Sequence, residues 1–361
     1  MCLALYVRNP LIGQQIHEIG LNLHTLDQLL TSSPGANNII VKQEAFLRAI
    51  SNLGHLCSLC LCCHYLDRGL PPGHNTLRFI PRLVTNVSSN LTSLSLRFPA
   101  ALFSSIISGD APSFPDLHLE TLRISITNGY DRTHQSCPPD RLIVLIGKTV
   151  SSVKSLEFYC WDLGFNMLDF WSSLGNMSLP RLEKFGLGFI PHQDSVPDAT
   201  SLNRFLLAHS SSLTELSLTH GPEVREFYPD FSLWYRDCFR GVPPNQALQK
   251  LVLSILYTDD FMTSPYVSIL GSIYSSLESL TLLTQPLSLY DVETLLQSLT
   301  CDQLKSLKLH VRSLDTKLLE LLKERCPKLQ ELVLKLLHDY DEIREPTSRR
   351  VSCGLSYVIM A

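Results

Sequence analysis

Apolar residues recur along this chain in the spacing LxxLxL, where the first, fourth and sixth positions are leucine or a similar residue. Clear copies cover residues 213–218, 277–282 and 304–309. Successive side chains of a β-strand point to opposite faces, so the last two apolar positions share one face and the residue between them lies on the other. Each copy therefore predicts a short strand with one buried face and one exposed face.

The copies form a long series, and segments with helical apolar spacing precede many of them. Copies begin at Leu56, Leu91, Leu119, Val153, Leu182, Leu213, Leu248, Leu277, Leu304 and Leu329. Helical spacing occurs at 203–208, 266–273, 292–299 and 318–325. One strand and one helix cannot bury their apolar faces alone, so neighbouring units must stack. The pattern predicts an α/β leucine-rich-repeat solenoid, a horseshoe with parallel strands on the concave face and helices on the convex face.

The repeats also predict the domain organisation. We expect a solenoid over residues 1–337, with about ten to eleven repeats, and an irregular C-terminal tail over residues 338–361. Residues 3–7 predict one more strand, followed by spaced apolar positions at Ile16, Ile19, Leu23, Leu26, Leu29 and Leu30. We therefore expect the chain to begin inside a repeat. Because an uncovered solenoid end exposes core leucines, we expect an N-terminal cap or domain upstream of Met1.

Composition narrows the classes of function. Of the 361 residues, 45% are hydrophobic and 18% charged, which suits a folded core, and the net charge of -4 disfavours a nucleic-acid or anionic-lipid partner held by bulk charge. No apolar run approaches the roughly 18 residues of a membrane span, and the N-terminus lacks the features of a secretory signal. The eleven cysteines are odd in number and scattered. We therefore expect an intracellular protein, cytoplasmic or nuclear, with free thiols.

Residues 324–334 carry the sequence Glu-Arg-Cys-Pro-Lys-Leu-Gln-Glu-Leu-Val-Leu. This CPxLxxLxL form resembles the repeats of F-box leucine-rich-repeat proteins, and as a repeat pattern the resemblance covers about residues 1–337. In that family an F-box segment ahead of the repeats binds the Skp adaptor of a cullin-RING ubiquitin ligase, and the repeats hold the substrate. The resemblance implies a non-catalytic protein-recognition module.

This sequence departs from the family at its start, because no Leu-Pro-x-Glu opening or other F-box signature lies near Met1. A Skp adaptor is therefore an expected partner only if an F-box lies upstream. The alternative is a leucine-rich-repeat scaffold or inhibitor unrelated to ubiquitin transfer.

Two segments contain residue types used in cofactor and metal sites. Gly147-Lys148-Thr149 resembles the end of a phosphate-binding loop, but position 142 is Leu where that loop needs Gly, so the segment predicts the end of a repeat helix. Cys57, Cys60, Cys62, Cys63 and His64 are soft metal ligands on a predicted strand without a second ligand pair. Ordinary repeat cysteines are the favoured interpretation, and a zinc site is the alternative. We find no catalytic motif and expect no enzyme activity and no cofactor.

The residues that alternate with the buried positions predict a partner-binding surface on the concave face, since a curved parallel sheet suits a protein or peptide. Its members are Arg97, Arg123, Glu157, Tyr159, Trp161, Glu215, Lys250, Lys308, His310 and Lys335, joined by the smaller Ser217, Ser254 and Thr281. Tyr159 and Trp161 are candidate hot-spot residues; two ordinary strand-edge residues are the alternative. Lys250, Lys308, Arg312 and Lys335 suggest an acidic partner at the C-terminal end, or merely a solvated face.

An aromatic-rich insertion covers residues 223–246. Phe231, Trp234, Tyr235, Cys238 and Phe239 keep helical spacing within it. A helix packed on the convex side is the favoured interpretation, and an exposed docking loop is the alternative.

Overall fold

A computed structural model describes residues 15–31, 36–63, 75–107, 116–127, 139–162, 165–190, 198–220, 231–242, 247–254, 276–283, 286–299, 301–336 and 355–360. The chain divides into two compact units. Unit 1 is residues 1–182, 187–201 and 221–227; unit 2 is residues 183–186, 202–220 and 228–361.

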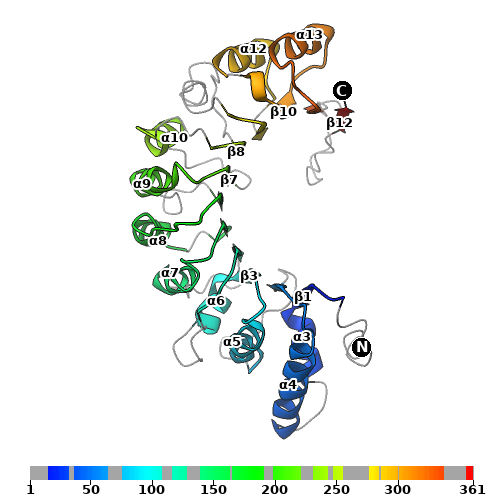
Figure 1. Ribbon diagram of the computed structural model, residues 1–361, viewed down its shortest axis with the longest axis vertical. Helices are drawn as coiled ribbons and strands as arrows, with labels where there is room; N and C mark the ends of the chain where they lie inside the picture. Colours follow the sequence, from blue (N-terminus) through cyan, green and yellow to red (C-terminus); the bar gives the residue numbers. More distant parts are fainter. Residues whose placement is uncertain are drawn as a thin grey trace, which may run out of the picture. The chain divides into compact units, whose positions relative to one another are not determined.

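Unit 1 alternates strands with helices (Figure 1). In chain order its elements are β1 (Glu18–Asn22), α3 (Leu23–Thr31), α4 (Ala36–Ser51), β2 (Ser58–Cys62), α5 (Asn75–Val87), β3 (Ser93–Pro99), α6 (Ala100–Ile107), β4 (Thr121–Thr127), α7 (Pro139–Gly147), β5 (Ser155–Cys160) and α8 (Met167–Leu174). Strands β1 to β5 pair in parallel, each with the next along the chain. Helices α4, α5 and α6 pack on one another in sequence, as do α7 and α8.

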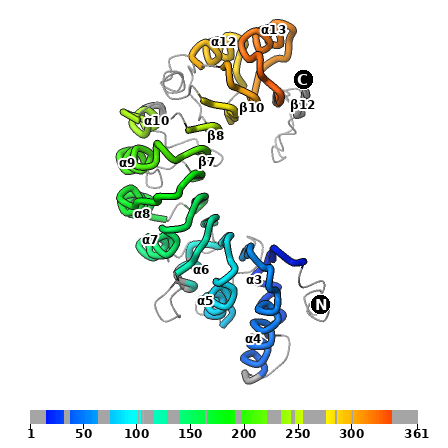
Figure 2. The backbone as a smooth tube through the Cα atoms, viewed as in Figure 1, coloured from blue at the N-terminus to red at the C-terminus, as the bar shows by residue number. Residues whose placement is uncertain are grey.

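Unit 2 repeats this construction, as the coloured tube in Figure 2 shows from green to orange. Its elements are β7 (Glu215–His220), α10 (Phe231–Phe239), β8 (Lys250–Ser254), β9 (Ser279–Leu283), α12 (Leu289–Ser298), the 3-10 turn η1 (Cys301–Gln303), β10 (Ser306–Val311), α13 (Thr316–Arg325), β11 (Glu331–Leu336) and β12 (Leu355–Met360). Strands β7 to β11 pair in parallel and β12 pairs antiparallel with β11. Strand β6 (Lys184–Phe189) and helix α9 (Ala199–His209) contribute residues to both units.

The cohesion of each unit comes from rows of stacked leucines. In unit 1, Leu59, Leu94, Leu122 and Leu156 occupy one register position of four successive strands, and all four have no exposed surface. Full burial of one leucine side chain is worth about 1.5 to 3 kcal/mol. Because every copy of the motif adds a residue to each row, the repeat accumulates this stabilisation along the unit.

Backbone hydrogen bonds fix the register just before each strand. The carbonyl of Glu120 accepts from the amides of Lys154 and Ser155, and the carbonyl of Glu278 accepts from the amides of Lys305 and Ser306. Each carbonyl is thus shared by two donors of the following repeat. Buried backbone amides and carbonyls need hydrogen-bond partners. This arrangement supplies acceptors for the two amides at the start of each strand named here.

The leucine-rich-repeat fold predicted from the sequence is confirmed, because parallel strands alternate with helices and each of the ten predicted motif copies forms a strand, β2 to β11. The predicted helical segments at 203–208, 292–299 and 318–325 lie in α9, α12 and α13 or overlap their ends. Residues 3–7 and 266–273 lie outside the described residues. Across the described part of the chain, no helix has the length and apolarity needed to cross a membrane.

The apolar positions near the start of the chain divide between two elements, and one prediction is corrected at the other end. Ile19 belongs to strand β1, since it pairs with Leu59, whereas Leu23, Leu26 and Leu30 belong to helix α3. The predicted irregular tail contains β12, whose backbone pairs with β11 from Leu336 back to Glu331. An edge strand presents unpaired amides and carbonyls, so an antiparallel partner strand satisfies these groups.

Candidate protein-interaction surface

In each unit we call the face formed by the strand residues that alternate with the buried rows the open face. Most of the predicted partner-binding residues lie on these strands, and Trp161 directly follows β5. In unit 1, one row of this face runs through Cys62, Arg97, Ser125 and Tyr159. The next row runs through Cys60, Ser95, Arg123 and Glu157. Both rows cross strands β2 to β5.

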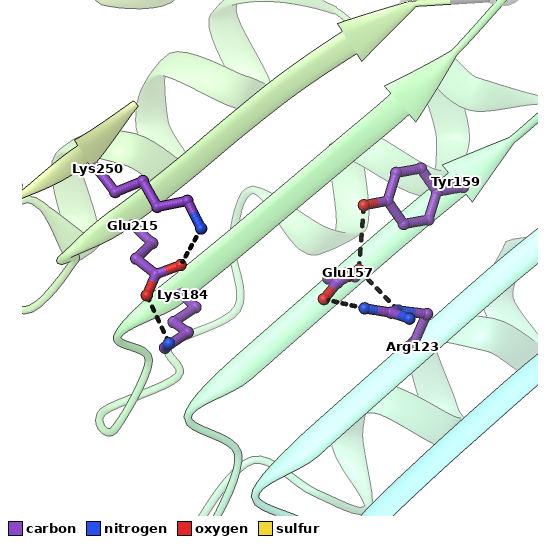
Figure 3. A network of polar contacts seen from close by, with 6 residues as sticks. All are labelled: Arg123, Glu157, Tyr159, Lys184, Glu215 and Lys250. Carbon is purple, nitrogen blue, oxygen red and sulfur yellow. Dashed lines mark hydrogen bonds and ion pairs between the residues drawn. The ribbon is translucent and has the colours of Figure 1, made fainter. Parts of the chain in front are cut away.

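Arg123 and Glu157 form a two-pronged ion pair between β4 and β5 (Figure 3). The Nε and Nη2 atoms of Arg123 each donate to one carboxylate oxygen of Glu157 at 2.7 Å, and the hydroxyl of Tyr159 donates to the same carboxylate at 3.0 Å. Bidentate pairs of this kind fix orientation as well as charge. The carboxylate of Glu157 therefore holds two of its neighbours in place.

The pKa values of Arg123 and Tyr159 are both shifted further from neutral pH. The hydrogen bond with Glu157 raises the pKa of Arg123, against the opposing effect of partial burial. Burial raises the pKa of Tyr159 to about 12, helped by the negative charge of Glu157. Both residues are thus locked in their usual forms, Arg123 protonated and Tyr159 neutral.

Tyr159 and Trp161 form a stacked aromatic pair at the end of β5. Their ring centroids lie 6.2 Å apart with 21° between the ring planes, and both side chains are half-buried. The backbone amide of Trp161 donates to the carbonyl of Ile126 at 2.7 Å, which anchors the residue to β4. The pair presents fixed aromatic surface on the open face.

Arg97 lies on β3 and is exposed on this face. Within the part of the chain that the structure describes, its side chain has no ion pair and no hydrogen bond. Its register neighbours Cys62 and Ser125 are uncharged. Arg97 is therefore the positive charge that the neighbouring strands do not neutralise.

The open face of unit 2 carries lysines that already have carboxylate partners. Glu215 lies between Lys184, at 2.5 Å, and Lys250, at 3.4 Å, as Figure 3 shows. Although partial burial acts to raise it, the hydrogen bond from Lys184 and the charge of Lys250 hold the pKa of Glu215 below its ordinary value. Glu215 thus remains a carboxylate and offsets part of the lysine charge.

The C-terminal repeats show the same pairing. Lys308 lies 3.1 Å from Glu331, whose pKa is lowered by the hydrogen bond from Ser306 and then by Lys308. Lys335 is exposed, and Arg312 donates from Nε to the carbonyl of Pro286 at 3.2 Å. Because Lys250 and Lys308 are both paired, the predicted basic end of the face is weaker than the sequence suggested.

The structure brings some predicted residues together and separates others. Arg123, Glu157, Tyr159 and Trp161 form one cluster, and Glu215 and Lys250 form another. His310 and Lys335 pair in register on β10 and β11. Lys184, Ser306 and Glu331 complete these contacts and were missed from the sequence. Their signal is their place directly before the fourth position of the motif, the place that Glu215 and Lys250 hold in their own copies.

The predicted exposure of Ser254 on the open face is wrong, because this residue is only 4% exposed. The hydroxyl of Tyr235 donates to the carbonyl of Ser254 at 2.7 Å. Helix α10 therefore reaches the end of β8, and Ser254 becomes part of the core. The favoured interpretation of the aromatic insertion is confirmed for α10, in which Tyr235, Cys238 and Phe239 are buried.

The described residues of the candidate phosphate-binding and metal-binding segments have structural roles in the repeats. Gly147 ends helix α7, the buried hydroxyl of Thr149 donates to the carbonyl of Ile146 at 2.8 Å, and Lys148 pairs with Asp116. This confirms the end of a repeat helix. Cys60 and Cys62 alternate with buried leucines on β2. No group of three metal-ligating side chains occurs among the described residues, and His64 lies outside them.

This chain resembles solved structures but matches no known family. No family model matches this chain, and no curated protein matches it significantly. A crystal structure of a Rad7 and Elc1 complex in yeast contains a similar chain, with 16% identity and a TM-score of 0.49, over 91% of this chain and 72% of that chain. A protein from Bacteroides fragilis is similar with 15% identity and a TM-score of 0.39, over 87% and 74%. At these TM-scores the repeat fold rests on the strand and helix order of the chain itself.

Proposed function

We propose that this chain is a non-catalytic protein-recognition module whose partner binds on the open face of unit 1. The observation that supports this most is the cluster of Arg123, Glu157, Tyr159 and Trp161, in which hydrogen bonds and ring stacking hold aromatic surface in a fixed position. A side chain that is already ordered loses little entropy on binding, and tyrosine and tryptophan are over-represented among hot spots.

The pKa shifts on this face favour recognition over catalysis. A general acid or base works best with a pKa near the working pH. Here the pKa values of Arg123 and Tyr159 are both raised, so each shift stabilises the form that the group already has at neutral pH. These groups are suited to hold a partner by charge and shape.

Affinity capture tests the proposal. The intact chain and a Tyr159→Ala plus Trp161→Ala variant should be used as baits in parallel, with captured proteins identified by mass spectrometry. The matched control is Tyr290→Ala, because Tyr290 is 65% exposed and belongs to helix α12, not to a strand of the sheet. The proposal requires that the double variant lose captured proteins that the control retains. An identical set from all three baits would contradict it.

The finer form of the proposal is a substrate-holding module of an F-box ubiquitin-ligase subunit acting inside the cell. Its support is the resemblance at residues 324–334, where Cys326 is buried and caps helix α13 ahead of β11. Co-purification with a Skp adaptor, using the chain together with any sequence encoded upstream of Met1, tests this form. If that longer protein ignores the adaptor, a scaffold or inhibitor outside ubiquitin transfer becomes the better account.

A further inference from the structure

We infer that the partner of the open face of unit 1 is an acidic peptide segment, whose carboxylate binds Arg97 and whose neighbouring large apolar side chain packs on Tyr159 and Trp161. This inference rests on the proposed function and specifies the chemistry of the partner.

The charge of the surface supports a carboxylate. The charged residues on the described open face of β1 to β5 are Glu18, Arg97, Arg123 and Glu157. Glu18 lies on β1 in the row of Ser58 and Ser93, two strands and two rows away from Arg97. The Arg123 and Glu157 charges offset each other through their two hydrogen bonds. Arg97 is left with neutral register neighbours. A guanidinium in such surroundings favours a planar, bidentate carboxylate.

The geometry supports an apolar anchor beside that carboxylate. Arg97 and Tyr159 lie in the same row of the sheet, two strands apart, with the small Ser125 between them. Neighbouring strands are about 4.8 Å apart, so the two backbones are separated by about 10 Å. About three extended residues cover that distance. The acidic and apolar residues of the partner should therefore lie within about three positions of each other.

The aromatic pair is prepared for an apolar side chain. The hydroxyl of Tyr159 is engaged by Glu157, so its ring is held, and the ring of Trp161 stacks on it at 21°. A large apolar side chain that covers these rings removes aromatic surface from water without disturbing either contact. The nearby negative charge of Glu157 is neutralised by Arg123, so it does not repel an acidic segment.

A displayed library of random peptides, selected on the intact chain, tests this inference. Selected peptides should share Asp or Glu within about three residues of Phe, Tyr, Trp or Leu. Synthetic copies should bind Arg97→Ala about ten- to a hundredfold more weakly, as expected for the loss of a hydrogen bond to a charged group. Arg78→Ala is the matched control, because Arg78 is an exposed arginine on helix α5, and it should leave the affinity unchanged.

Charge reversal makes the test independent of any loss of folding. A selected peptide with its acidic residue changed to Lys should bind Arg97→Glu more tightly than it binds the unmodified chain. Both proteins should also be compared for helical circular dichroism, and the same signal is expected from each because Arg97 is exposed.

The outcomes separate this inference from the proposed function. Peptides that depend on Tyr159 and Trp161 but carry no acidic residue and tolerate Arg97→Ala would overturn the acidic partner and leave recognition by this face standing. Peptides insensitive to all of these changes, or no selected peptides, would overturn both. A fluorescent single-stranded RNA oligonucleotide that bound through Arg97 and the aromatic pair would also overturn the acidic-peptide inference.

Discussion

Gly175 and Ser201 approach each other so closely in unit 1 that a β-carbon at position 175 would lie 2.7 Å from the Ser201 carbonyl oxygen. Gly175 ends helix α8 with an ordinary right-handed backbone, φ -61°, and Ser201 lies in the first turn of α9. The glycine is therefore required for the space between the two helix ends, and its backbone conformation would admit other residues.

Replacement of this glycine should be costly. We expect Gly175→Ala to lower the free energy of unfolding by about 1 to 3 kcal/mol, because backbone atoms on both sides must move. Gly147→Ala is the matched control, since nothing lies within 4 Å of a β-carbon there, at the end of α7. Alanine should be neutral or slightly stabilising at that site. Urea unfolding of the three proteins, monitored by circular dichroism, measures both effects; equal stabilities for the two variants would refute the steric argument.

Tyr159 should make stability depend on pH in the alkaline range. Its folded pKa is raised to about 12 by burial and by Glu157, above the ordinary value of 10.0. The folded state thus holds this proton more tightly than the unfolded state. The resulting stabilisation is fully present below pH 10.0 and is lost as the pH rises toward about 12. Tyr159→Phe should lose less stability over that interval, as measured by urea unfolding at several alkaline pH values.

His209 should make stability depend on pH in the mildly acidic range, where stability falls as the pH is lowered. Its ring is 3% exposed, and Nδ1 donates to the carbonyl of Phe205 at 2.7 Å. Burial lowers the pKa of His209, against the effect of that hydrogen bond, so the unfolded chain takes up the proton first. Stability should therefore fall as the pH drops below about 6.5.

The test for His209 compares the loss of unfolding free energy between neutral and mildly acidic pH in three proteins. His209→Leu should reduce that loss, whereas His118→Leu, at an exposed position before β4, should leave it in place. A loss of equal size in all three proteins would assign the acid sensitivity to other groups, such as the paired carboxylates of Glu215 and Glu331.

The strands and many of their cross-strand partners could be predicted from the sequence. Arg123 and Glu157 hold the same position in the copies that begin at Leu119 and Val153, and parallel strands in register bring equal positions together. The same rule accounts for the Glu278–Lys305 ion pair at 2.9 Å. An alignment of the motif copies therefore predicts these ion pairs from the sequence alone.

Strand β1 and the burial of Ser254 were harder to predict for physical reasons. β1 belongs to a copy that reads Ile16-His17-Glu18-Ile19-Gly20-Leu21, in which isoleucine replaces leucine and the apolar row runs straight into helix α3. A period of two and a period of 3.6 overlap there, so the strand is hidden. Ser254 is buried because helix α10 departs from the regular repeat and brings the Tyr235 hydroxyl to the end of β8.

Helix α12 begins with a reciprocal cap that the structure defines fully. The Ser288 hydroxyl accepts from the backbone amide of Asp291, and the Asp291 carboxylate accepts from the backbone amide of Ser288 at 2.7 Å. We expect Ser288→Ala to lower the free energy of unfolding by about 1 kcal/mol, because the amide of Asp291 loses its acceptor. Ser298→Ala, near the other end of the same helix, is the control: its hydroxyl only adds a bond to the Leu295 carbonyl. Urea midpoints that drop equally for both variants would show that the cap has no special role in this repeat.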